Sequence, residues 1–110
     1  MQPNDRIRIK HMIDAAEEAI SFAEGKYREA LDSERMLVLS LVKEIEIIGE
    51  AAVKVSVEVK EINSQVPWDD ITGMRNHLVH GYFDVDLDML WNTVKLDLPM
   101  LLIKLKKIIS

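Results

Sequence analysis

Residues 53–60, VKVSVEVK, decide the fold class of this chain. Valine alternates with a polar residue along the whole stretch, and strict alternation is typical of a half-buried β-strand. A lone strand, however, has no partner for its backbone hydrogen bonds. No other stretch alternates convincingly, so we expect helix here, extending the preceding helix to about Ile62. The chain is then all-α.

Helical spacing dominates the first half of the sequence. Apolar residues recur every three or four positions over residues 5–23, where Asn4 can cap the helix and Gly25 suggests its end. A second helix begins near residues 32–33 and carries the same kind of apolar stripe. Gly49 lies inside this helix and is either a weak spot or a point of close packing.

The second half of the sequence predicts two further helices after a break at residues 63–67. One runs from about Pro67 to His80, with Gly81 as its terminator. The last is capped by Asp84 or Asp86 and runs to Ile109, with a kink or a split near Pro99. The predicted fold is an up-and-down bundle of four to five helices.

Composition limits the possible functions. The 110 residues, 48% hydrophobic and 30% charged, suit one folded domain spanning residues 1–110. The absence of cysteine excludes disulfides, thiolate zinc sites and cysteine nucleophiles. A net charge of -5 argues against nucleic-acid binding over the whole surface but leaves a local basic cleft open. Because we find neither a membrane-spanning run nor a signal segment, we expect a cytoplasmic protein that does not bind membranes.

Functional side chains gather in residues 74–86, MRNHLVHGYFDVD. On a regular helix Asn76 and His80 share one face, while Arg75 lies about 140° from His80. Helix geometry alone therefore does not join them, although the length of arginine would let both border one pocket. Arginine binds phosphate, histidine transfers protons near neutral pH, and asparagine orients oxygens.

These groups suit metal-free cleavage of RNA by its own 2′-hydroxyl, which needs a proton acceptor, a proton donor and cations around the phosphate. One histidine per chain is little for this work. A symmetric dimer would supply two histidines and two arginines, so dimerisation is part of the hypothesis.

Simpler roles remain open for the same residues. His80 could only complement a helix dipole, and Tyr82 could only anchor the following loop. Trp68 and Trp91 suit the core. His77 and His80 have a spacing of three, but no carboxylate stands at a convincing ligand distance in the sequence, so we expect neither a metal nor another cofactor.

The motif resembles that of a known family. Residues 75–82, RNHLVHGY, are similar to the Arg-x4-His-x-Tyr motif of HEPN domains, in the branch that contains HepT-like toxins. Residues 47–52, IIGEAA, resemble the second-helix signature of that branch. Further similar segments are Pro67-Trp68, Val85-Asp86 and Leu98-Pro99, so the resemblance covers essentially the whole chain in order. The valine-rich stretch at 53–59 departs from the family pattern and puts the end of the second helix in doubt.

The resemblance implies a helical bundle that dimerises so that two motifs meet in a cleft. It implies a metal-independent endoribonuclease in which Arg75 and His80 are the catalytic pair and Asn76 assists them. The RNA substrate could be transfer RNA or messenger RNA. Many HepT-like toxins are encoded beside a minimal nucleotidyltransferase antitoxin that transfers AMP from ATP to the motif tyrosine, which here is Tyr82. Such AMPylation would obstruct the cleft and repel RNA.

Two other functions compete with the toxin. The chain could be a non-catalytic, substrate-binding partner of a nucleotidyltransferase, in which case it would bind that protein or nucleotides without cutting RNA. It could also be a purely structural helical dimer, which the acidic composition favours.

Overall fold

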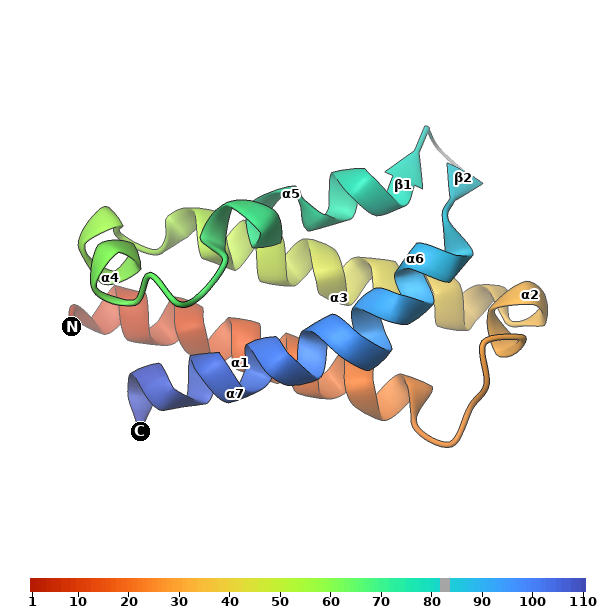
Figure 1. The fold of residues 1–110 in the computed structure, drawn as a ribbon, viewed down its shortest axis with the longest axis horizontal. Helices are drawn as coiled ribbons and strands as arrows, with labels where there is room; N and C mark the ends of the chain where they lie inside the picture. The colour runs from red at the N-terminus through yellow and green to blue at the C-terminus, as the bar shows by residue number, and fades with distance from the viewer. Residues whose placement is uncertain (82–83) are drawn as a thin grey trace.

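A computed structural model describes residues 1–81 and 84–110 as a bundle of long helices (Figure 1). The first three long helices are α1 (Pro3–Ala23), α3 (Arg35–Lys54) and α5 (Trp68–Leu78). The fourth is a continuous helical stretch of α6 (Leu87–Asn92), the π-helical turn η1 (Thr93–Asp97) and α7 (Leu98–Ile109). Short helices α2 (Ala30–Ser33) and α4 (Val57–Ile62) lie in the connections. Successive long helices run in opposite directions, which confirms the predicted all-α, up-and-down bundle.

The core lies between α1, α3, α5 and the last helical stretch. α1 packs against both α3 and α7, and α3 packs against α5. The buried side chains recur at the spacing of three and four that the sequence shows, because that spacing puts them on one face of each helix. The largest fully buried ones include Ile9, Met12, Leu41, Ile45, Ile48, Leu98 and Leu105. Within the described ranges, no helix is long and apolar enough to span a membrane.

The valine-rich stretch is helical on both sides of a break, so the prediction of an unbroken helix to Ile62 is wrong. α3 ends at Lys54, and α4 begins after Ser56, whose hydroxyl accepts a hydrogen bond from the Val59 N–H at 3.3 Å. Asp5 of α1 is buried and accepts from the Ser56 N–H at 2.8 Å and from its hydroxyl at 2.9 Å. This tertiary contact stabilises the break, because it gives the Ser56 N–H and the buried Asp5 carboxylate hydrogen-bond partners that they would otherwise lack.

Helix ends near the start of the chain also differ from expectation. α1 begins at Pro3, so Asn4 is inside it and is not its cap. The end near Gly25 is confirmed, since α1 stops at Ala23 and Gly25 has a φ of +74°. The second predicted helix is divided, because α2 stops at Ser33 before α3 begins.

The third predicted helix is shorter than expected and a small hairpin follows it. α5 ends at Leu78 instead of His80, and the strands β1 (Val79–His80) and β2 (Asp84–Val85) pair antiparallel. Val79 faces Val85 across the pair, in keeping with the strand preference of β-branched residues. Gly81, with a φ of +79°, therefore belongs to the hairpin and does not terminate the helix.

The last helical stretch shows both predicted features. The Asp86 carboxylate caps α6 by accepting from the Met89 N–H at 3.0 Å. Ahead of Pro99 the Leu98 N–H donates to the Thr93 carbonyl, five residues back, which is π-helical bonding. Proline lacks an N–H and crowds the preceding turn. The irregularity expected at Pro99 is thus a widened turn within a continuing helix.

Gly49 is a point of close packing between α3 and α5. A Cβ at this position would lie 3.3 Å from the Ile71 carbonyl oxygen and 3.7 Å from the Thr72 carbonyl oxygen. Both oxygens are backbone atoms and cannot rotate away as a side chain would. The lack of a side chain at Gly49 therefore sets how closely α5 approaches α3.

Replacing Gly49 should cost stability, whereas the matched change at Gly73 should not. Gly73→Ala gains helix propensity, and its Cβ meets only the flexible His77 ring at 3.5 Å, so we expect about 0.5–1 kcal/mol more stability. Gly49→Ala should lack this gain, and Gly49→Val should lose about 2 kcal/mol through overpacking. Urea denaturation measures all three. Equal stabilisation by the two alanine variants would contradict close packing at Gly49.

Glu44 is a buried acidic side chain on α3. One of its carboxylate oxygens has no hydrogen-bond partner in the described part of the chain. Burial, and secondarily the neighbouring Glu18 carboxyl, raises the pKa of Glu44 from 4.5 to about 7. The folded protein therefore holds a proton between these pH values that the unfolded chain releases.

Stability should consequently fall as pH rises from about 4.5 to 7, because the folded state binds more protons than the unfolded state in this window. Glu44→Gln is neutral at every pH, so it should be more stable than wild type by roughly 1–2 kcal/mol at pH 8. The difference should shrink towards pH 5. Urea denaturation at both pH values checks this, and a pH-independent difference would contradict it.

Candidate functional site

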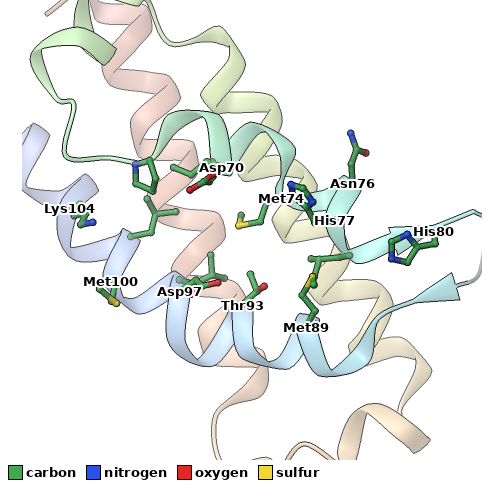
Figure 2. A pocket seen from close by; sticks show the side chains of 15 residues that line it. Asp70, Met74, Asn76, His77, His80, Met89, Thr93, Asp97, Met100 and Lys104 are labelled. Atoms are coloured by element: carbon green, nitrogen blue, oxygen red, sulfur yellow. The ribbon is translucent and has the colours of Figure 1, made fainter.

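A groove of about 690 Å³ lies between α5 and the helical stretch from α6 to α7 (Figure 2). Asn76, His77 and His80 contribute to one wall. The opposite wall includes Met89, Thr93, Asp97, Met100 and Lys104. This volume lies within the range of small-ligand sites, which also combine apolar walls with a few polar groups.

The π turn η1 forms part of the wall facing α5. Thr93 and Asp97, its first and last residues, both border the groove. Thr93 is buried, whereas Asp97 is exposed. A π turn widens a helix locally, so η1 affects the wall of the groove where Thr93 and Asp97 lie. Such turns are also frequent at functional sites.

His80 borders the groove from β1, beyond the end of α5. It therefore lies two residues beyond the last residue of α5, whereas the simpler interpretation had placed it in the last turn of the helix. Asp84 is its partner across the antiparallel pair. Facing residues in such a pair have Cβ atoms about 4.5–5.5 Å apart, so the two side chains start from neighbouring positions on the hairpin. Sequence reasoning considered Asp84 only as a possible helix cap and not as a neighbour of His80, because it predicted no strands.

His77 lies one helical turn beyond Gly73 on α5. Its Nε2 is 3.5 Å from the point that a Cβ of residue 73 would occupy, so the ring covers this glycine. The side chain is exposed and borders the groove with His80. His77 is thus a second imidazole at the same groove.

Arg75 lies beside Asn76 but faces a different helix. Its Nη1 donates to Asn76 Oδ1 at 3.5 Å, a long hydrogen bond, and its Nε is 3.7 Å from Glu46 Oε2 on α3. Asn76 borders the groove, although its side chain points away from α6 (Figure 2). The structure thus brings Asn76 and His80 to one groove and leaves Arg75 at its edge, outside the lining. Glu46 was also missed by the sequence reasoning.

Charges of both signs surround the groove. Asp70 and Asp97 contribute carboxylates, and Lys104 contributes an ammonium group. Within residues 1–81 and 84–110, no three histidine or acidic side chains gather as a metal site requires. Tyr82, the predicted modification site, lies outside the described residues.

Comparison with protein families identifies the chain. The family model described as "Ribonuclease HepT-like" matches residues 12–108, which include all of the bundle except its first turns. The chain belongs to the HepT-like ribonuclease family.

Three relatives of this HepT-like chain differ in how much of their length it covers. "Putative RNase TTE0752" of Caldanaerobacter subterraneus subsp. tengcongensis is 34% identical, over 93% of this chain and 91% of the relative. "Probable ribonuclease HepT" of Thermococcus cleftensis is 39% identical over 63% of each chain. "Gamma-glutamylcyclotransferase and putative RNase MJ0434" of Methanocaldococcus jannaschii is 30% identical over 100% of this chain and only 50% of the relative. No solved structure matches the chain.

Proposed function

We propose that this HepT-like chain is a metal-independent endoribonuclease, the toxin partner of a minimal nucleotidyltransferase antitoxin. The carrying observation is that Asn76 and His80 border one groove with Arg75 at its edge, in a chain of a ribonuclease family. These are the three residues that the motif resemblance assigns to catalysis.

The proposed reaction uses only proton transfer and charge stabilisation. A base takes the proton of the RNA 2′-hydroxyl, and the 2′-oxygen attacks the adjacent phosphorus. The bond from phosphorus to the 5′-oxygen breaks, and this oxygen takes a proton, which leaves a 2′,3′-cyclic phosphate and a 5′-hydroxyl. His80 acts as base or acid, Arg75 neutralises charge on the phosphate, and Asn76 orients its oxygens.

The reaction favours a symmetric homodimer. His80 gives one imidazole from the motif position, and Arg75 faces α3, so a second copy would supply the remaining groups. Apolar side chains beside the groove suit such contact. Leu96, Met100 and Ile103 recur at helical spacing and are each about 60% exposed. RNA would then bind where two grooves meet.

Modification of Tyr82 would regulate this site. Tyr82 follows His80 by only two residues in the sequence, so a modification of this tyrosine would be made close to the motif histidine along the chain. The phosphate of AMP carries negative charge and would repel the RNA backbone, while the nucleoside would occupy space in the groove. The nucleotidyltransferase would thereby inhibit the ribonuclease.

The central test is cleavage of labelled transfer RNA and messenger RNA in EDTA, with intact mass confirming that Tyr82 carries no AMP. Wild type should release products ending in 2′,3′-cyclic phosphate. His80→Ala should be slower by at least about 100-fold, as expected for loss of a general acid or base. His11→Ala, a change at an exposed histidine of α1, should be as active as wild type. Unmodified wild type that cuts no RNA in any buffer would contradict the proposal and favour a non-catalytic partner of the nucleotidyltransferase.

Dimerisation has its own test. Sedimentation of wild type should give twice 12.6 kDa. Met100→Asp with Ile103→Asp should shift the protein to monomer and abolish cleavage, because two carboxylates would be desolvated at the interface. Val57→Asp, at a position 68% exposed on α4, is the control and should remain dimeric. A wild-type monomer that cuts RNA would refute the composite site.

A further inference from the structure

Glu46 of α3 is the acidic partner of Arg75. Glu46 Oε2 lies 3.7 Å from Arg75 Nε, and the two side chains are 31% and 42% exposed. Glu46 is outside the sequence motif, comes from another helix and does not border the groove. Its effect on the reaction would therefore act through Arg75.

The backbone places Glu46 at the point where α3 and α5 come closest. Glu46 and Gly49 are three residues apart and so lie on one face of α3. Gly49 meets the carbonyls of Ile71 and Thr72, and Arg75 follows Ile71 by one turn along the antiparallel α5. The rigid contact at Gly49 thus fixes the distance at which Glu46 and Arg75 meet.

The contact leaves part of the guanidinium group of Arg75 available. A guanidinium offers five N–H groups in a planar fork, of which the Nε–H faces Glu46 and one Nη1–H faces Asn76. The end of the fork formed by the two Nη atoms is one of its edges that can bind phosphate bidentately, and it is the edge without Nε. A carboxylate on the Nε side favours the arginine rotamers that keep Nε near it, and these rotamers turn the Nη edge away from Glu46.

We propose that Glu46 is a positioning residue that holds the Arg75 guanidinium in the orientation needed for the scissile phosphate. The proposal rests on the ribonuclease function proposed above. Glu46 also carries negative charge close to where the phosphate would bind, so it opposes RNA binding electrostatically. The contribution of Glu46 to the reaction would then be the orientation of the Arg75 guanidinium and not the binding of RNA.

Removing Glu46 should affect kcat and KM differently, because Glu46 orients Arg75 but repels RNA. Glu46→Ala frees Arg75 to adopt other rotamers, so kcat should fall roughly tenfold, as misplacement of a catalytic group does. KM should stay the same or decrease, because a repulsive charge has been removed. Glu46→Gln keeps the size and an acceptor oxygen but loses the charge, so its kcat should lie between those of wild type and Glu46→Ala.

The experiment compares kcat and KM for RNA cleavage by wild type, Glu46→Ala, Glu46→Gln and the control Glu58→Gln, an exposed glutamate on α4 that changes net charge equally. Thermal melting of each protein reports whether it is folded. The expected result is a graded fall in kcat without a rise in KM and with unchanged melting, confined to the Glu46 variants.

Other outcomes overturn the proposal. Unchanged kcat in Glu46→Ala would make the ion pair an ordinary surface contact. A fall in kcat that parallels lower melting temperature, or that occurs equally in Glu58→Gln, would indicate a structural or general charge effect. If wild type cleaves RNA and one of these two outcomes is found, only the role of Glu46 is refuted. If wild type cleaves no RNA, the ribonuclease proposal and this one are refuted together.

Discussion

The close approach of α5 to α3 at Gly49 is the constraint on which the site depends. A glycine there lets the backbone carbonyls of Ile71 and Thr72 lie against α3, and no other residue leaves this surface free. α5 then carries Arg75 past α3 at the distance that permits its ion pair with Glu46. The same helix leads directly into β1, which carries His80. This packing contact therefore positions Arg75, and His80 follows in the strand directly after the same helix.

The early end of α5 separates two functions of this segment. Arg75 is still helical and faces α3, whereas His80 lies in a strand and borders the groove. On a continuous helix the two side chains would have been about 140° apart. The hairpin releases His80 from the helical direction and places Asp84 across from it. The motif thus joins an arginine on α5 to a histidine whose position depends on the hairpin.

Sequence periodicity predicts the long helices and their buried faces well, because the apolar residues that each helix buries recur at a spacing of three and four within its own sequence. The sequence also offers two roles for Gly49 and two candidate caps, Asp84 and Asp86, and the structure shows close packing at Gly49 and capping by Asp86. Sequence periodicity fails where a distant residue decides the local structure. The break after Lys54 depends on Asp5, fifty-one residues before Ser56. Strands of two residues are too short to give a periodic signal. The sequence therefore did not predict β1, and for the same reason it did not predict that α5 ends at Leu78, directly before β1.

The candidate site shows the same division between local and tertiary information. Arg75, Asn76 and His80 are recognisable because their types and spacing match a motif, and structure places them at or beside one groove. Glu46 and Asp84 are ordinary acidic residues in the sequence, and their relation to the motif appears only when α3 and β2 are in place.

These acidic partners bear on how an acidic chain could act on RNA. The groove carries carboxylates from Asp70 and Asp97 and the ammonium group of Lys104. Glu46 pairs with Arg75, and Asp84 faces His80 across the hairpin. Bulk attraction for phosphate is therefore weak, in contrast to a basic nucleic-acid surface. Affinity would have to come from a few oriented contacts, which a second copy of the groove would double. The proposed orientation of Arg75 by Glu46 and the proposed symmetric dimer would both compensate for this shortage of positive charge.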